Sequence, residues 1–229
     1  MQNVLITGSK GRRGRILSKG LSEHYKLSLA DLPENDIRNY KKLLKLTKGK
    51  NAIIHLAWKA KTENFQNGRI DADNFLMVYN IYRSAIKSKV SRVIIASSIH
   101  ADNFRKPKKV PISPLEIPSP TSPYGADKIG IESLGKYYSS KGIEVICIRF
   151  GAVGYGIPRK GSEGSVVWLA PRDCVSLIES ILDSKKVPNN FSIIYGVSNN
   201  KKRVHDISNP FGWKPKEGFG FKFNGLNSK

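Results

Sequence analysis

A doubly wound α/β fold, in which helices cover both faces of a parallel sheet, is the architecture that this sequence predicts. Short apolar runs alternate with helix-like segments along most of its 229 residues. The runs are continuous stretches of valine, isoleucine and leucine, as expected for strands that are buried on both faces. A hydrophobic content of 39% suits one globular domain with a sizeable core.

The expected strands are apolar runs of strand length, beginning with "NVLITG" near the first residue. They span residues 3–8, 26–32, 51–58, 92–98 and 144–153. Helices are expected between them, over residues 12–24, 37–49, 71–88 and about 122–140. Ser122 is a good N-cap residue and Pro123 suits the first position of the last of these helices.

Beyond residue 153 the alternation is less regular. A helix is expected from about Arg172 to residue 184 and a strand over 191–198, and residues 105–123 are proline-rich and predict a long loop. We therefore divide the chain into a regularly alternating core (1–153) and a small C-terminal lobe (154–229), interwoven as one compact unit.

The net charge of +21 attracts anions such as phosphorylated metabolites or nucleic acid. The basic residues are spread along the chain, so a solvated basic surface with at most nonspecific nucleic-acid binding is favoured. No apolar run is long enough to cross a bilayer, and Cys147 and Cys174 lie in apolar stretches that predict buried free thiols. These observations predict a cytoplasmic protein without a membrane partner.

A glycine-rich loop, "ITGSKGRRGR", joins the first strand to the first helix. Gly8, Gly11 and Gly14 recur every three residues, which allows a tight turn and a close approach to a pyrophosphate at the helix N-terminus. Glycines at this spacing alone indicate only a turn. Between a strand and a helix of an α/β pattern, they favour a dinucleotide site.

Asp31 ends the second strand, close to the ~20-residue offset at which a carboxylate binds the adenosine ribose hydroxyls. A carboxylate there repels a 2′-phosphate, so NAD is favoured over NADP. Lys10, Arg12 and Arg13 favour the opposite choice if they lie near the ribose, although the two arginines could equally be exposed to solvent.

Tyr124 and Lys128 share one face of the expected helix at 122–140, one turn apart. A phenol has a pKa of ~10, and a nearby ammonium stabilises the phenolate, so the pair could transfer a proton. An ordinary surface pair is the alternative.

These motifs, with "HLAW", "ASS", "YGADK" and "IRFGAV" in order, resemble the extended short-chain dehydrogenase/reductase (NAD-dependent epimerase/dehydratase) superfamily. Three further stretches, "SSIHADNF", "WLAPRDCVSLIESIL" and "YGVSNNKKR", resemble its uronate dehydrogenase group, which includes an NAD-dependent glucose-6-phosphate dehydrogenase. The resemblance implies a Rossmann-type sheet, NAD as cofactor, a homo-oligomer, and oxidation of a sugar at its anomeric carbon. It makes residues 1–153 the NAD-binding core and residues 154–229 the substrate-binding lobe.

The resemblance also implies roles for individual residues. Tyr124 becomes the general base, Lys128 its electrostatic partner and ribose ligand, and Ser98 or Ser97 the hydroxyl that orients the substrate. The implied cofactor-binding residues are Gly8, Ser9, Lys10, Gly11, Arg12, Arg13, Gly14, Asp31, Leu32, Asp36, Ile37, Leu56, Ala57, Trp58, Asn74, Ala96, Tyr124, Lys128 and Phe150. The implied substrate-binding residues are Ser97, Ser98, Ile99, His100, Tyr124, Gly151 and Ala152, and no metal ligand is assigned.

Four positions depart from the pattern of the uronate dehydrogenase group. Ile99 replaces an asparagine, Trp58 replaces a glycine, and Ala152 replaces a serine or asparagine. Glu163 stands where the group has an arginine that binds the uronate carboxylate, which makes a uronate substrate doubtful. His100 could compensate for the lost amide or could serve packing alone.

The leading hypothesis is an NAD-dependent dehydrogenase acting on a uronate, an aldose or a sugar phosphate. One alternative is a nucleotide-sugar epimerase or dehydratase with tightly bound NAD. Another is a relative that binds nucleotide or RNA and has lost the chemistry.

Overall fold

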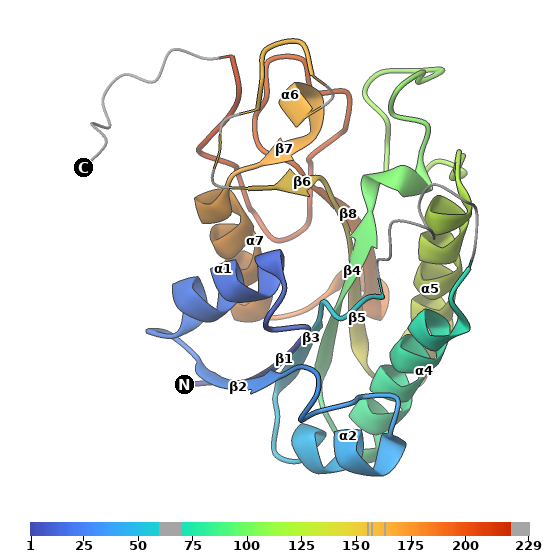
Figure 1. Cartoon of the computed structure of the whole chain (residues 1–229), viewed down its shortest axis with the longest axis vertical. Coiled ribbons are helices and arrows are strands. Elements are labelled where there is room, and N and C mark those ends of the chain that lie inside the picture. The colour runs from blue at the N-terminus through green and yellow to red at the C-terminus, as the bar shows by residue number, and fades with distance from the viewer. Residues whose placement is uncertain (60–69, 155, 157, 163, 221–229) are drawn as a thin grey trace.

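The computed structural model describes residues 1–59, 70–154, 156, 158–162 and 164–220. Its main sheet contains β1 (Asn3–Thr7), β2 (Lys26–Ala30), β3 (Ala52–His55), β4 (Arg92–Ser98), β5 (Glu144–Phe150) and β8 (Phe191–Gly196). The strands are parallel and lie in the order β2-β1-β3-β4-β5-β8 (Figure 1). This arrangement confirms the predicted Rossmann-type sheet.

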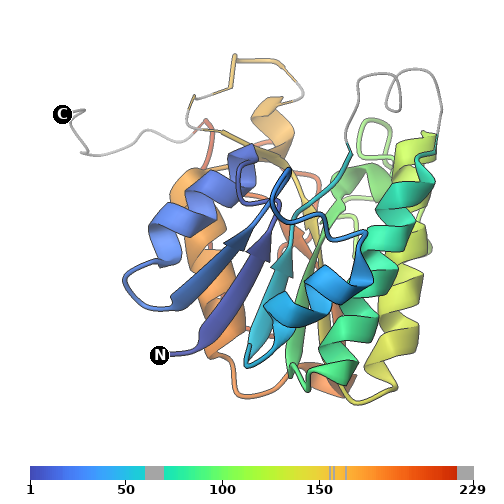
Figure 2. The ribbon, with the colours of Figure 1, turned by 60° about the horizontal axis from the view of Figure 1, so that its bottom comes forward.

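Helices lie on both faces of the sheet (Figure 2). On one face are α1 (Arg12–Leu21) and α7 (Pro171–Asp183), and on the other are α2 (Tyr40–Thr47), α4 (Ala72–Lys87) and α5 (Pro123–Ser139). Because successive strand residues point to opposite faces, Leu5 and Ile6 of β1 enter different core clusters, and both are fully buried. Burial on both faces explains why the strands read as continuous apolar runs.

Capping residues set where two of the predicted helices begin. Ser122 Oγ accepts a hydrogen bond from the Gly125 N–H at 3.1 Å, and Pro123 is the first residue of α5, as predicted. The helix predicted from residue 37 starts only at Tyr40, because Asn39 is its N-cap and accepts from the Lys42 N–H at 3.1 Å. The prediction of residues 37–39 as helical was therefore wrong.

The strand predicted over 144–153 is divided at Gly151. Its first part is β5, whereas β6 (Ala152–Val153) pairs with β7 (Trp168–Leu169) in a separate two-stranded sheet. A Cβ at Gly151 would lie 1.9 Å from the Val167 carbonyl oxygen, so only glycine allows the chain to leave the main sheet here. An apolar run cannot reveal which of two sheets a residue joins.

Segments from the C-terminal third belong to the core as well as to the region above the sheet. β8 extends the main sheet beside β5, and α7 packs against α1. Above the carboxyl ends of the strands lie β6, β7 and α6 (Gly164–Val167) (Figure 1). The division at residue 153 stays a prediction.

Short 3₁₀ helices, η1 (Ile99–Ala101) and η2 (Pro188–Asn190), complete the regular structure that is described. Residues 102–122, all of which the structure describes, contain no helix or strand, in agreement with the predicted loop. Cys147 and Cys174 are free and buried, as predicted. Among the described residues, no helix is long and apolar enough to span a membrane.

A buried ionic network lies beside the carboxyl ends of β4 and β5. Arg149 of β5 is fully buried and donates to Glu132 of α5 at 2.8 and 2.9 Å and to Asp102 at 2.8 Å. Tyr195 of β8 donates to the same Asp102 carboxylate at 2.5 Å. Ser97 of β4 donates to Glu132 at 2.5 Å. The network therefore joins three strands, α5 and the residue that follows η1.

We expect Arg149→Met to lower the free energy of unfolding by about 3–5 kcal/mol, because it leaves the carboxylates of Glu132 and Asp102 buried without their cation. Urea denaturation of the variant and wild type at pH 7 measures the difference. The matched control is Arg15→Met, an exposed arginine on α1, which we expect to change stability by no more than about 0.5 kcal/mol. A loss at Arg149 no larger than the control would contradict the structural role of the network.

Candidate active site

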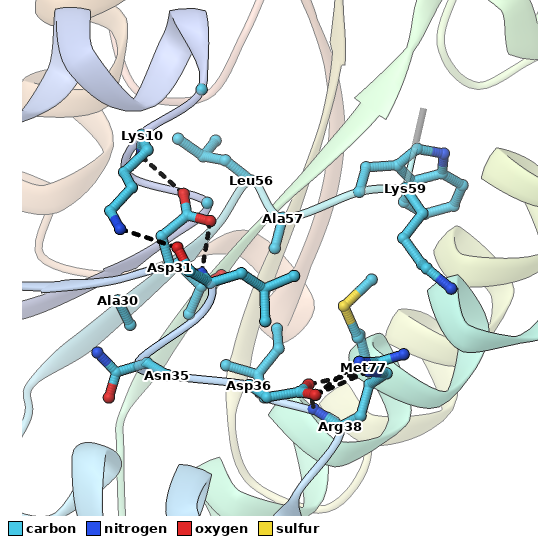
Figure 3. A pocket seen from close by; sticks show the side chains of 16 residues that line it. Lys10, Ala30, Asp31, Asn35, Asp36, Arg38, Leu56, Ala57, Lys59 and Met77 are labelled. Atoms are coloured by element: carbon cyan, nitrogen blue, oxygen red, sulfur yellow. Dashed lines mark hydrogen bonds and ion pairs between the residues drawn. The ribbon is translucent and has the colours of Figure 1, made fainter. Parts of the chain in front are cut away.

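Two neighbouring pockets open at the carboxyl ends of the strands. The first, which we call the nucleotide pocket, has a volume of about 250 Å³ and lies where the chain passes from one side of β1 to the other. Ligands of open parallel sheets bind at such a switch point. It is lined by Thr7, Gly8, Lys10, Gly11, Ala30, Asp31, Leu32, Asn35, Asp36, Ile37, Arg38, Leu56, Ala57, Trp58, Lys59 and Met77 (Figure 3).

The glycine-rich loop forms one wall of this pocket. Gly8 has φ +73°, and a Cβ there would lie 2.5 Å from the Ala57 nitrogen. A Cβ at Gly14 would lie 2.3 Å from the Gly8 carbonyl oxygen. Because these glycines have no side chains, the loop, the start of α1 and the end of β3 can pack closely together. The groups that face a ligand here are therefore backbone atoms rather than side chains.

Asp31 is held in place by two backbone amides. Its carboxylate accepts from the Lys10 N–H at 2.7 Å and from the Leu32 N–H at 2.8 Å (Figure 3). The Lys10 ammonium donates to Glu34 at 2.9 Å and to the Leu32 carbonyl at 2.8 Å. A carboxylate therefore lines the pocket, while the nearest lysine is already paired with another acid.

Arg12 and Arg13, the other two cations considered for a 2′-phosphate, do not line the nucleotide pocket. Arg12 is exposed, and its Nη1 donates to the Val153 carbonyl at 3.4 Å. Arg13 points to the second pocket instead. Ser9 lines an adjoining hollow beside α1, which shares Lys10, Asp31 and Asn35 with the nucleotide pocket.

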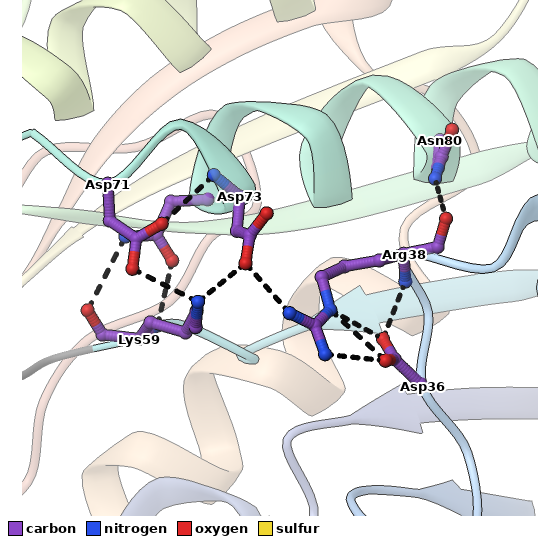
Figure 4. Close-up of polar contacts among 7 residues, drawn as sticks. Asp36, Arg38, Lys59, Asp71, Asp73 and Asn80 are labelled. Atoms are coloured by element: carbon purple, nitrogen blue, oxygen red, sulfur yellow. Dashed lines mark hydrogen bonds and ion pairs between the residues drawn. The ribbon is translucent and has the colours of Figure 1, made fainter.

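An ion network that the sequence analysis missed includes Asp36, Arg38 and Lys59, which line the nucleotide pocket. Figure 4 shows its contacts. Arg38 pairs with Asp36 at 2.6 Å and with Asp73 of α4 at 2.8 Å, and Lys59 pairs with Asp73 at 2.5 Å. The Arg38 carbonyl also accepts from Asn80 at 2.9 Å. No spacing in the sequence indicated this network, because its members come from three separate segments.

The second pocket, which we call the reaction pocket, has a volume of about 310 Å³. It brings together residues from the glycine-rich loop, the end of β4, α5 and the end of β5. Its lining residues are Arg13, Ser98, Ile99, His100, Phe104, Tyr124, Phe150, Gly151, Ala152, Gly164 and Val167. The predicted base, the predicted orienting hydroxyl of Ser98 and six other predicted substrate or cofactor residues thus share one cavity.

Tyr124 and Lys128 remain close together in the folded chain. The Lys128 Nζ lies 5.6 Å from the centroid of the Tyr124 ring and donates to the Ala96 carbonyl at 2.9 Å. Lys128 is only 2% exposed, and its pKa is lowered well below the usual value by burial and secondly by the charge of Arg13. Lys128 is therefore in the interior, while Tyr124 is half-buried at the wall of the reaction pocket.

Trp58 stands between the two pockets. It lines the nucleotide pocket, and its ring centroid lies 3.1 Å from the Lys128 Nζ. The Trp58 and Tyr124 rings form a T-shaped pair with centroids 6.1 Å apart. The indole therefore turns inward and covers the ammonium, rather than turning outward. Asn74, fully buried on α4, holds this segment by accepting from the Lys59 N–H at 2.7 Å.

Ser98 and Ser97 have different surroundings. Ser98 lines the reaction pocket and accepts from the His100 N–H at 3.2 Å. Ser97 is bound to Glu132 in the ionic network and does not line the reaction pocket. The His100 ring lines the pocket with its centroid 5.7 Å from that of Tyr124. Glu163, the predicted departure at the uronate-binding position, lies outside the described residues.

Comparison with known proteins matches residues 4–173 to the NAD dependent epimerase/dehydratase family. The chain belongs to this family. An NAD-dependent glucose-6-phosphate dehydrogenase of Haloferax volcanii is 26% identical, over 90% of this chain and 88% of its own. A uronate dehydrogenase of Pseudomonas syringae is 30% identical, over 86% of this chain and 75% of its own.

Solved structures of the family have the same fold. The crystal structure of uronate dehydrogenase from Agrobacterium tumefaciens superposes with a TM-score of 0.82 at 25% identity, covering 95% of this chain and 85% of its own. The resemblance predicted from the motifs is thus confirmed. The roles of the individual site residues stay predictions.

Below the site, His55 at the end of β3 predicts an acid-sensitive stability. Its Nδ1 lies 2.8 Å from Thr7 Oγ1, and burial, with the charge of Lys128, lowers its pKa to about 3. A histidine in the unfolded chain has a pKa of ~6.5. Below that pH the unfolded chain binds a proton at His55 that the folded chain does not bind, so the free energy of unfolding falls.

We therefore expect His55→Gln to lose less stability than wild type between pH 7.5 and 5.5, by roughly 1 kcal/mol. Urea unfolding at both pH values provides the measurement. His24→Gln, which removes an imidazole at an exposed position, is the control. An unchanged pH dependence in His55→Gln would show that this histidine is protonated in the folded protein.

Proposed function

We propose that the protein is an NAD-dependent dehydrogenase that oxidises a sugar at its anomeric carbon to a lactone. The observation that carries the proposal is the meeting of Tyr124 and Ser98 in one cavity, beside the buried ammonium of Lys128 and next to the nucleotide pocket. The names of the family members support the substrate class, since they include glucose-6-phosphate, uronate and L-arabinose dehydrogenases.

The residues of the nucleotide pocket fit a dinucleotide. Gly8 and Gly14 leave a cradle of bare backbone at the N-terminus of α1, where a pyrophosphate is favoured. Asp31 can accept hydrogen bonds from the ribose hydroxyls of the adenosine half. Because its carboxylate would repel a 2′-phosphate and Lys10 is paired with Glu34, NAD is preferred over NADP.

In the proposed mechanism, the Tyr124 oxygen takes the proton of the anomeric hydroxyl. The positive charge of Lys128 stabilises the phenolate form of that tyrosine, and the Ser98 hydroxyl orients the substrate oxygen. NAD, when bound, supplies the acceptor for the hydride. Ile99, Phe104 and Val167 give the cavity apolar walls that limit water around the reacting groups.

We further propose that two chains associate through α4 and α5. Helix residues on this face leave a stripe of large apolar side chains exposed, whereas Tyr82 and Tyr138 between them are buried and stacked at 5.1 Å. Exposed apolar patches of this kind mark association surfaces. The stripe consists of Phe75, Leu76, Tyr79, Ile86 and Tyr137. The cytoplasmic location and nonspecific nucleic-acid binding remain predictions.

The proposed function is tested by measuring NADH formation with a panel of uronates, aldoses and aldose phosphates. We expect Tyr124→Phe to lower kcat by about 100- to 10,000-fold while NAD binding is kept, because the variant lacks only the proton-accepting oxygen. Tyr40→Phe on α2 is the matched control and should leave kcat unchanged.

No NADH from any sugar, or an unchanged kcat in Tyr124→Phe, would overturn the proposal. Purified protein that carries one NAD per chain without net turnover would instead favour the epimerase alternative.

Cofactor choice is tested at Asp31. We expect Asp31→Ala to raise KM for NAD by about 10-fold or more, because the ribose loses charge-assisted hydrogen bonds worth about 1.5–3 kcal/mol, and to raise the NADP/NAD ratio of kcat/KM. Glu23→Ala, an exposed acid between α1 and β2, is the control. An unaltered ratio in Asp31→Ala would show that the carboxylate does not select the cofactor.

A further inference from the structure

Arg13 has an unusual position for a residue of the glycine-rich loop. It belongs to the first turn of α1, yet its side chain lines the reaction pocket with Tyr124 and Ser98 rather than the nucleotide pocket. Its guanidinium carbon lies 5.0 Å from the centroid of the Phe150 ring. The Arg13 guanidinium therefore lies over the Phe150 ring, inside the cavity proposed to bind the substrate.

The hydrogen-bonding capacity of Arg13 is not used up by the protein. Its Nη2 donates to the Gly151 carbonyl at 3.2 Å, while its Nε is buried without a hydrogen-bond partner. Among the described residues, no carboxylate forms an ion pair with Arg13. A guanidinium has five N–H donors in a planar fork. Arg13 as a whole is half-buried, but its buried Nε–H is costly to leave without an acceptor, which a bound anion would supply.

The charge of the reaction pocket also favours an anionic ligand. Its described lining includes no aspartate or glutamate, and Lys128 lies close enough for the positive charge of Arg13 to lower its pKa. Arg13, which is half-buried, thus places a positive charge in this cavity, while Lys128 lies buried nearby without lining it. The net charge of +21 on the whole chain adds a long-range attraction for anions.

We propose that Arg13 is the anion-binding residue of the reaction pocket and that the substrate is a sugar carrying a carboxylate or a phosphate. The proposal rests on the proposed function and adds to it the substrate class and the residue that selects it. The planar fork of Arg13 pairs with two oxygens of the anion, while Tyr124 and Ser98 act on the anomeric hydroxyl of the same sugar.

The test compares Arg13→Gln with wild type on three sugars: galacturonate, glucose 6-phosphate and glucose. We expect kcat/KM for whichever charged sugar wild type prefers to fall about 10- to 100-fold, because a charge-assisted pair is lost. The kcat/KM for glucose and KM for NAD should stay within about threefold of the wild-type values. The charged sugar that loses most identifies the anion as carboxylate or phosphate.

Two further variants make the outcome specific. Arg13→Lys keeps the charge but not the fork, and we expect it to recover part of the lost kcat/KM for the charged sugar. Arg15→Gln, an exposed arginine on the same helix, should behave as wild type. A melting temperature near that of wild type shows that each variant is folded.

Three results would overturn the inference. One is an equal loss on charged and neutral sugars with a raised KM for NAD, which would make Arg13 a cofactor ligand. Another is no change in Arg13→Gln, and the third is a wild-type preference for glucose.

Failure of the proposed function is distinguished by binding measured without turnover. If wild type forms no NADH with any sugar, calorimetric titration with galacturonate, glucose 6-phosphate and glucose still tests the anion site. Binding of a charged sugar that Arg13→Gln abolishes would support the site alone, and absence of such binding would overturn it.

Discussion

Arg149 lies fully buried between Glu132 of α5 and Asp102 after η1, and the geometry of the candidate site depends on this ionic contact. Tyr124 and Lys128 belong to the same helix as Glu132, while Ser98 follows Ser97, which Glu132 also binds. The network therefore determines how α5 sits against the ends of β4 and β5. Burying the charges of Arg149, Glu132 and Asp102 has a large desolvation cost, which their mutual attraction offsets only if all three remain in place. That requirement makes it a rigid base for the reaction pocket.

The nucleotide pocket and the reaction pocket differ in charge. Asp31 and the paired Lys10 give the nucleotide pocket an acceptor for hydroxyl groups, whereas Arg13 places a positive charge in the reaction pocket and Lys128 lies buried nearby. Trp58 lies between the two and covers the Lys128 ammonium with its ring. An aromatic face stabilises a cation without supplying a negative charge, so this contact opposes the burial that lowers the pKa of Lys128.

Much of the fold and part of the site could be predicted from the sequence. The apolar runs placed the strands, and the motif around Ser122 placed the start of α5, because strand burial and helix capping are local properties. The pairing of Tyr124 with Lys128 followed from helix geometry alone. The division of the strand at Gly151 was missed, since the cause is a close approach of Val167, a residue distant in sequence.

The amino-acid sequence by itself determined the alternation of strands and helices, the bare glycine cradle and the shared helix face of Tyr124 and Lys128, because each depends on neighbours within a few residues. Tertiary structure alone decided that Arg13 enters the reaction pocket, that Ser98 rather than Ser97 faces it, and that Arg38 joins Asp36 to Asp73. In those cases the direction of a side chain is set by groups from other segments. Charge and burial there depend on how the elements pack, which no local pattern records.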